Sequence, residues 1–185
     1  DVRQLHGMPR RQLTVRRDVP RPRARVGVVG REHGHHERER APLRAARRAG
    51  DRHAEASLLR GLGDLRRFQD RLTEAATLFT DSSVIFRELG DTGGEVDSLT
   101  GLARTYRRQD RLAEAASCFE QCLGLCPALD DPDREAKAML FFAKVRRAQG
   151  RLEDALALLT SCREIFHSVG SGGYVAYTDL MIGIV

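Results

Sequence analysis

The sequence predicts an all-α fold, a right-handed α-solenoid of antiparallel helix pairs, on three observations. From Gly50 onward the chain repeats its register every 40 residues, so that RFQDRLTEAATLF, RRQDRLAEAASCF and RAQGRLEDALALL align. Within each repeat, apolar residues recur at three and four residues, as on one face of a helix. The repeats show no strand-like alternation of useful length. A fixed period of this size is typical of stacked units that cannot bury their apolar faces alone.

Each repeat is expected to hold two helices. In the second copy, the first helix should run from about Gly94 to Arg108 and the second from Leu112 to near Leu129. Asp110 is expected to cap the second helix, because its carboxylate can accept hydrogen bonds from the free amides of the first turn. The expected solenoid domain covers 41–185, with repeats at about 50–89, 90–129 and 130–169, a partial repeat at 170–185 whose helix spans about 173–185, and a partial leading helix at about 41–49.

Small and large side chains alternate at fixed positions of the repeat. One position is always small, at Gly63, Ala103, Ala143 and Gly183, and a second holds Ala75, Ala115 and Ala155. Small residues let two helices approach closely, and large ones then fill the space between layers. We therefore expect four large apolar side chains to be buried between the helices: Phe79, Leu102, Phe119 and Phe142.

At these positions the chain resembles the tetratricopeptide repeat. The matching residues of the second copy are Leu99, Leu102, Ala103, Tyr106, Asp110, Ala115, Phe119 and Cys122. The chain departs from the family at Arg66 and Arg146, where Tyr is expected, and at Asp70 and Asp110, where the turn has Gly. Its repeat is also longer than the 34 residues that are typical of the family. The long form, with extra residues at the junctions, is similar to the C-terminal arrays of large high-GC bacterial regulators of the antibiotic-regulatory-protein and STAND ATPase types.

The composition changes sharply near Gly50. Residues 1–50 contain 14 Arg, 5 acidic residues and no Phe, Tyr or Trp, whereas residues 51–185 contain 17 basic and 21 acidic residues. Residues 1–40 have too few large apolar groups to offset the entropy of ordering. They are read either as a disordered basic arm or as non-native sequence from a reading-frame error in GC-rich DNA. We favour the second, because the repeat register returns cleanly at Leu43.

The sequence predicts a cytoplasmic chain. No apolar stretch reaches the length of a membrane-spanning helix, and no secretory signal is found at the N-terminus. The four cysteines lie inside helical patterns, which fits a reducing compartment. Cys118, Cys122 and Cys126 share one helix face and are interpreted as core residues rather than as a metal site.

No catalytic residue, metal site or cofactor is expected. The tract of His33, His35 and His36 lies where no fold is predicted to fix a metal geometry. The glycine-rich segments at 61–63, 93–94 and 170–173 lack the Lys and Ser/Thr of a phosphate loop, and we interpret them as packing and junction glycines. No Ser-His-Asp or Cys-His signature is present, so an enzyme is not expected.

The resemblance implies a peptide-binding groove on the polar side of the first helices. Transferred residue by residue, the groove face comprises Ser57, Arg60, Asp64, Arg67, Phe68, Asp97, Thr100, Arg104, Arg107, Arg108, Lys137, Leu140, Lys144 and Arg147. Eight of these fourteen residues are basic and two are acidic. A solvated charged face is the ordinary reading of such a pattern. The functional alternative is a groove for an acidic peptide or an acidic domain surface.

The function predicted from the sequence is protein–protein interaction by a repeat scaffold, as the tail of a larger bacterial transcriptional or signalling regulator. The alternative is non-specific nucleic-acid contact through the Arg-rich N-terminal arm, without aromatic residues for base stacking. The partner is expected to be an acidic protein or peptide, or another domain of the parent protein. Self-association is also expected, through the apolar face of Leu180, Met181, Ile182 and Ile184.

Overall fold

A computed structural model describes residues 41–185, and the interpretations of residues 1–40 and of their histidine tract lie outside these residues. Residues 41–49 are helical. They are followed by α2 (Arg52–Phe68), α3 (Leu72–Leu89), α4 (Thr92–Arg108), α5 (Leu112–Leu125), the 3₁₀ helix η1 (Cys126–Ala128), α6 (Pro132–Ala148), α7 (Leu152–Ser168) and α8 (Gly172–Ile182).

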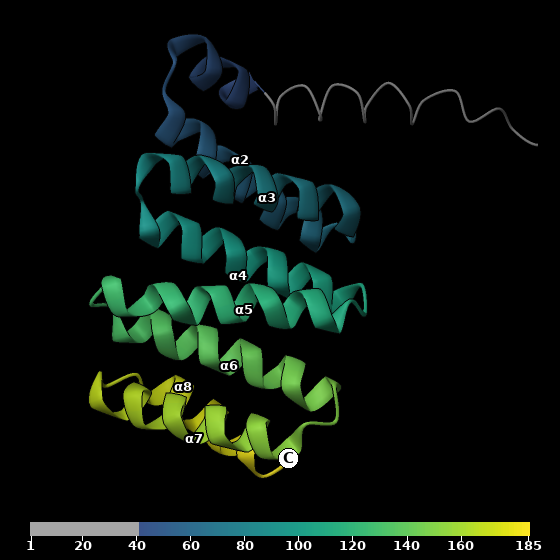
Figure 1. Ribbon diagram of the computed structural model, residues 1–185, viewed down its shortest axis with the longest axis vertical. Helices are drawn as coiled ribbons and strands as arrows, with labels where there is room; N and C mark the ends of the chain where they lie inside the picture. The colour runs from purple at the N-terminus through teal and green to yellow at the C-terminus, as the bar shows by residue number, and fades with distance from the viewer. Residues whose placement is uncertain (1–40) are drawn as a thin grey trace, which may run out of the picture.

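The helices form antiparallel pairs that stack in one direction, from α2 and α3 to α7 and α8 (Figure 1). Each helix packs against the next along the chain, and the first helices α2, α4 and α6 also contact one another. The described residues form helices and turns and no strand. The predicted all-α solenoid is therefore confirmed. Within residues 41–185, no helix is both long and apolar enough to cross a membrane.

The turns between helices depend on residues in the left-handed backbone region. Gly50, Gly90 and Gly170 have φ of 70°, 73° and 73°, and Asp130 takes the same region at 50°. The turns inside the repeats use Asp70, Asp110 and Gly150, with φ of 62°, 60° and 75°. Aspartate is one of the few residues other than glycine that adopts this conformation readily.

The expectation that Asp110 caps α5 is wrong. Asp110 ends the preceding turn in the left-handed conformation, and the N-cap residue is Arg111, whose side chain makes no capping bond. Side-chain caps instead begin the first helices. Asp51, Asp91 and Asp131 accept hydrogen bonds from the backbone amides of residues 54, 94 and 134 at 2.9, 2.8 and 3.0 Å.

Three helix bounds also differ from the expected ones. The helix expected to reach Leu129 stops at Leu125 and continues as η1, because Pro127 lacks the amide that an α-helical bond needs. The last helix, expected over 173–185, ends at Ile182. The first helix of the second repeat begins at Thr92, two residues before the expected Gly94.

The apolar core lies between the helix layers, as expected from the repeat. Phe79 and Phe119 are fully buried, and Leu102 and Phe142 are 6% and 5% exposed, so the predicted burial of these four side chains is confirmed. The rings of Phe119 and Phe142 stack with their centroids 5.8 Å apart. These contacts join the second repeat to the third.

The two arginines that replace the family tyrosine are accommodated by polar partners. Arg66 is 2% exposed, and it donates a hydrogen bond to Gln69 Oε1 at 2.8 Å. Arg146 donates to Glu120 Oε1 at 2.7 Å and packs over the ring of Phe142. A long side chain with a charged end can fill an apolar position when its head finds such partners.

Candidate peptide-binding groove

The first helices line a groove that has a cavity of about 550 Å³. Its walls come from α2, α4 and α6, with Tyr174 of α8 closing one end. The lining residues are Arg60, Asp64, Asp97, Thr100, Gly101, Arg104, Asp131, Asp133, Arg134, Lys137, Ala138, Phe141 and Tyr174. Four of them are basic and four are acidic, so this part of the groove is balanced in charge.

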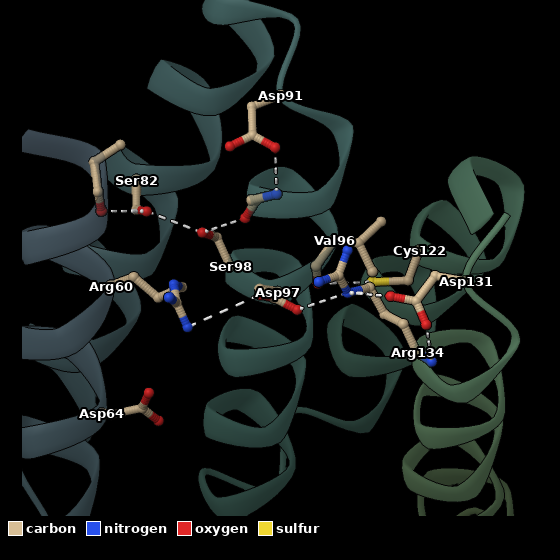
Figure 2. A network of polar contacts seen from close by, with 12 residues as sticks. Arg60, Asp64, Ser82, Asp91, Val96, Asp97, Ser98, Cys122, Asp131 and Arg134 are labelled. Atoms are coloured by element: carbon tan, nitrogen blue, oxygen red, sulfur yellow. Dashed lines mark hydrogen bonds and ion pairs between the residues drawn. The ribbon is translucent and has the colours of Figure 1, made fainter. Parts of the chain in front are cut away.

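One half of the groove is held by ion pairs between neighbouring repeats (Figure 2). Asp97 on α4 lies between Arg60 on α2 and Arg134 on α6, with closest N–O distances of 3.9 and 3.3 Å. Arg134 also reaches Asp131, the N-cap residue of α6, at 3.6 Å. Asp97 thus links three first helices. In this half, the basic side chains already have carboxylate partners.

Lys137 belongs to the same paired half. Its ammonium lies 2.5 Å from Asp133 Oδ2 on the preceding turn of α6. The hydrogen bond to this carboxylate raises the pKa of Lys137 above its ordinary value. Lys137 is therefore charged at neutral pH, but its charge is largely compensated within its own helix.

The other half of the groove face carries cations without carboxylate partners. Among the described residues, no carboxylate lies within ion-pair distance of Arg104, Arg107, Lys144 or Arg147. Arg104 and Lys144 are half-buried, whereas Arg107 and Arg147 are exposed. These four residues lie toward the C-terminal ends of α4 and α6, where the helix dipole favours positive charge.

Arg104 has the most perturbed environment of these four cations. Burial lowers the pKa of its guanidinium, and the positive charges of Arg67 and Arg107 lower it further, while Asp64 opposes the shift. The Arg104 guanidinium packs over the ring of Phe141 at 4.3 Å. Burial and like charge both disfavour the charged form, so an anion placed here would gain more than at an exposed site.

Aromatic rings hold the unpaired cations in place. Lys144 lies 5.0 Å from the ring centroid of Phe141 and 4.8 Å from that of Tyr177. The ring of Phe141 therefore makes cation–π contacts with Arg104 on α4 and with Lys144 on α6 at the same time. Cation–π contacts are worth about 0.5–1 kcal/mol at exposed sites and more when desolvated.

A second, mainly apolar cavity of about 470 Å³ adjoins this half of the groove. Leu140, Phe141, Tyr174 and Tyr177 line it, together with Lys144 and the backbone at the start of α8. Phe141 also lines the larger cavity, so the two cavities share a wall.

The structure brings together part of the predicted site. Arg60, Asp64, Arg104 and Lys137 line the groove, and Lys144 lines the adjoining cavity. Arg67 is buried beside Asp64, with its Nη2 2.7 Å from Asp64 Oδ1.

The remaining predicted residues lie outside both cavities. Arg107 and Arg147 are exposed beyond the cavity walls. Arg108 donates hydrogen bonds to the backbone carbonyl of Arg67 and to the carboxylate of Asp70. It therefore joins two repeats and is not available to a partner protein.

Seven lining residues of the larger cavity were missed by the sequence reasoning. Asp131, Asp133 and Arg134 belong to a junction between repeats, and Gly101, Ala138, Phe141 and Tyr174 lie on first helices but were not assigned to the groove. The sequence did contain a signal for Asp131, Asp133 and Arg134. Asp51 and Asp91 occupy the place equivalent to Asp131, so an aspartate N-cap at the start of this first helix could have been predicted. With these residues included, the mainly basic groove face becomes one balanced half and one cationic half.

The cysteines behave as core residues. Cys118, Cys122, Cys126 and Cys162 are all buried free thiols. Burial raises the pKa of Cys122 to about 12 and those of the other three to about 11, so the reactive thiolate is scarce at neutral pH. In residues 41–185, no group of three or more His, Cys, Asp or Glu side chains could hold a metal ion.

Stacked helix pairs with a groove along their first helices define a helical-repeat binding domain. The tetratricopeptide repeat family model matches residues 54–128 and 94–168, which together exceed half of the chain, and the chain belongs to this family. Such repeats generally mediate protein–protein interaction, and their fold is typical of non-enzymatic scaffolds.

Solved structures share the fold at low sequence identity. The chain is similar to BtubC (BKLC) from P. vanneervenii, with a TM-score of 0.70 and 19% identity over 80% of this chain and 63% of that one. It spans less than two thirds of that protein. A putative kinesin light chain from Podosopora anserina with nearly identical TPR-like repeats gives a TM-score of 0.55 at 17% identity, over 70% of this chain and 68% of that one. No curated protein matches the chain.

Proposed function

We propose that this chain is a protein-interaction scaffold whose first-helix groove binds an acidic segment of a partner protein. The observation that carries the proposal is the unequal pairing of the groove cations. Arg60, Arg134 and Lys137 have carboxylates beside them, whereas Arg104 and Lys144 have aromatic rings and no carboxylate among the described residues. Cations held without a counter-charge are available to a ligand.

The energetics favour several weak contacts acting together. Exposed ion pairs contribute only about 0.2–1 kcal/mol each, so no single cation in the groove can provide strong binding. A row of cations mainly accelerates association with an acidic partner and makes that rate fall with salt. The half-buried Arg104 should contribute more than the exposed Arg107, because solvent screens its charge less.

A charge-reversal experiment tests the proposal. The probe is a fluorescent polyglutamate peptide, and binding is followed by anisotropy at low and physiological salt. The double variant Arg104→Glu with Lys144→Glu should bind the peptide at least about tenfold more weakly than the parent chain. Helical content should stay nearly unchanged and the melting temperature should fall only slightly, because both side chains lose ring contacts but neither makes an ion pair in the described structure.

The matched control changes the net charge by the same amount outside the groove. Arg48→Glu with Arg111→Glu removes two exposed arginines and should leave peptide binding close to that of the parent. Equal loss in both double variants would show that net charge, and not the groove, captures the peptide. Deletion of residues 1–40 separates the alternative function, since nucleic-acid contact through the arm requires this deletion to abolish binding of a single-stranded oligonucleotide.

The larger context is also a proposal. We propose that the chain is the repeat tail of a bacterial transcriptional or signalling regulator that acts in the cytoplasm. The long repeat, with extra residues at the junctions, supports this proposal. Translation of the upstream genomic DNA in all three frames tests this idea, because further repeats or a nucleotide-binding domain should appear in one of them. Upstream DNA with neither feature would contradict it.

We also propose a second partner, a further copy of this chain that packs against α8. Helix α8 lies at the end of the helix stack (Figure 1). Leu180 on α8 and Ile184 just after it are 62% and 53% exposed. The expectation that Met181 is part of the same exposed face is wrong, because Met181 is 5% exposed and belongs to the core, against which Ile182 also packs. A helix that is apolar on most sides is usually covered.

A further inference from the structure

Four cations lie in or beside the cationic half of the groove, and we call them the cation cluster: Arg67, Arg104, Arg107 and Lys144. The charges of Arg67 and Arg107 both act on Arg104. Lys144 joins the group through Phe141, whose ring centroid is 4.3 Å from the Arg104 guanidinium and 5.0 Å from the Lys144 ammonium. The four charges come from α2, α4 and α6, and Arg104 and Lys144 line the two adjoining cavities that share Phe141 as a wall.

The cation cluster is short of negative charge. Asp64 pairs with Arg67 at 2.7 Å, and it is the one carboxylate among the described residues that pairs with a member of the cluster. Three of the four positive charges have no ion-pair partner there. Like charges held close together in a partly desolvated site destabilise one another, so a bound anion would relieve this repulsion.

A donor inside the cluster also lacks a partner. Arg67 is only 6% exposed, and its Nε is a buried nitrogen without a hydrogen-bond partner in the described part of the chain. A buried donor that stays unbonded is costly, and arginine at such a place is suited to an oxyanion.

The positions of the cations are set before any ligand arrives. Phe141 supports Arg104 and Lys144 on one ring, and Tyr177 contacts Lys144 from α8 at 4.8 Å. Side chains that are ordered in advance lose less entropy on binding. Arg104 and Lys144 are thus held in advance, whereas Arg107 is an exposed cation beside them.

We propose that the cation cluster binds a phosphoryl group on the partner segment, carried by a phosphorylated hydroxyl side chain. The inference rests on the proposed groove function and names the chemistry of its central contact. A carboxylate brings one negative charge and two oxygens, whereas a phosphoryl group brings nearly two charges and three acceptor oxygens. Three cations without ion-pair partners match a phosphoryl group better than a carboxylate.

Peptide libraries test the preference. Immobilised peptides with randomised flanks carry one fixed central residue, which is phosphoserine, glutamate or serine, and the full chain is the probe. The phosphoserine library should retain about tenfold more protein than the glutamate library, and the serine library should retain the least. Arg104→Gln and Lys144→Gln should each reduce the phosphoserine preference severalfold. Arg48→Gln, which removes an exposed arginine outside the groove, should leave it unchanged.

The outcomes separate this inference from the function on which it rests. Equal retention on phosphoserine and glutamate would overturn the phosphoryl preference and leave the acidic-segment groove standing. If the double variant Arg104→Glu with Lys144→Glu loses polyglutamate binding but still prefers the phosphoserine library, the phosphoryl group binds outside the cation cluster and the inference is wrong. If inorganic phosphate shifts the Arg104 side-chain NMR signals but the phosphoserine library retains nothing, the site takes free phosphate, and the inference is wrong. It is also wrong if a single-stranded oligonucleotide displaces the protein more effectively than phosphoserine peptides do.

Discussion

The ring of Phe79 on α3 lies against the Cα of Gly101 on α4, so that no side chain fits between the two helices at this point. A Cβ built on Gly101 would overlap the ring at its Cε1, Cζ and Cδ1 atoms. Gly63 on α2 also packs against the Phe79 ring, because a Cβ built on Gly63 would lie 3.0 Å from Phe79 Cε1. Phe79 is fully buried and held from two helices, so it cannot move aside cheaply.

Gly101→Ala should therefore destabilise the chain, although it replaces a helix-interior glycine. Alanine normally stabilises such a position by about 0.5–1 kcal/mol, but overpacking costs about 1–3 kcal/mol. Gly61→Ala is the matched control, because Gly61 is also inside a helix and its Cβ would meet nothing within 4 Å. We expect denaturant melts to show a loss for the first variant and a gain for the second. A gain in both variants would contradict the close approach.

The stacking of Phe119 on Phe142 gives a second prediction about the core. Phe119 is fully buried where the second and third repeats meet, and its ring lies 5.8 Å from that of Phe142. Phe119→Ala should lower the free energy of unfolding by about 3–5 kcal/mol, as other large-to-small core changes do. A loss of less than about 1 kcal/mol in urea melts would be inconsistent with a shared core between repeats.

Periodicity was enough to predict the helix pairs and the core, because both depend on short-range spacing. The turn at Asp110 was harder, since aspartate suits both a helix N-cap and a left-handed turn residue, and the composition does not separate these roles. Only the backbone shows that Asp110 has φ of 60°, that α5 has no side-chain cap, and that the capping aspartate, Asp91, begins α4 instead.

The groove was predicted less completely, because its chemistry depends on how helices face one another. Leu140 was assigned to the groove, but it is 1% exposed, and the next residue, Phe141, forms the shared wall of the two cavities. One residue along a helix turns the side chain by about 100°. The pairing of Asp97 with Arg60 and Arg134 likewise depends on the stacking of three repeats, which no local pattern encodes.

The junction before α2 provides a prediction about pH. Glu55 accepts hydrogen bonds from Arg47 Nε at 2.7 Å and from Arg52 Nη1 at 2.8 Å. The bond from Arg47 is the main reason that the pKa of Glu55 is lowered, while burial opposes the shift. A lowered folded-state pKa means that the stabilisation is present above the ordinary pKa of glutamate and is lost as the pH falls through the lowered value.

Glu55→Gln should therefore lower the free energy of unfolding by about 0.5–1 kcal/mol at neutral pH, since both arginines are half exposed. The difference from the parent should vanish in acid, where Glu55 is protonated in both states. Glu88→Gln is the control, because Glu88 also pairs with Arg52 but is well exposed. Thermal melts across the acid range check this, and a difference that persists unchanged below the folded-state pKa would contradict it.

Helix α8 gives the last prediction, which concerns association of the chain with itself. Leu180 and Ile184 present an apolar face at the end of the stack, and Asp179 beside them is already paired with Arg163 on α7. Apolar area covered on association is worth about 25 cal/mol per Å², so this face should drive concentration-dependent association. Leu180→Glu should shift the chain toward monomer in sedimentation velocity, because a buried carboxylate would oppose the contact. Val84→Glu places the same charge on an apolar site of α3 that is 42% exposed and remote from α8, and it should leave association unchanged. A parent chain that stays monomeric at high concentration would show that the face of α8 is too small or too irregular to hold two copies together.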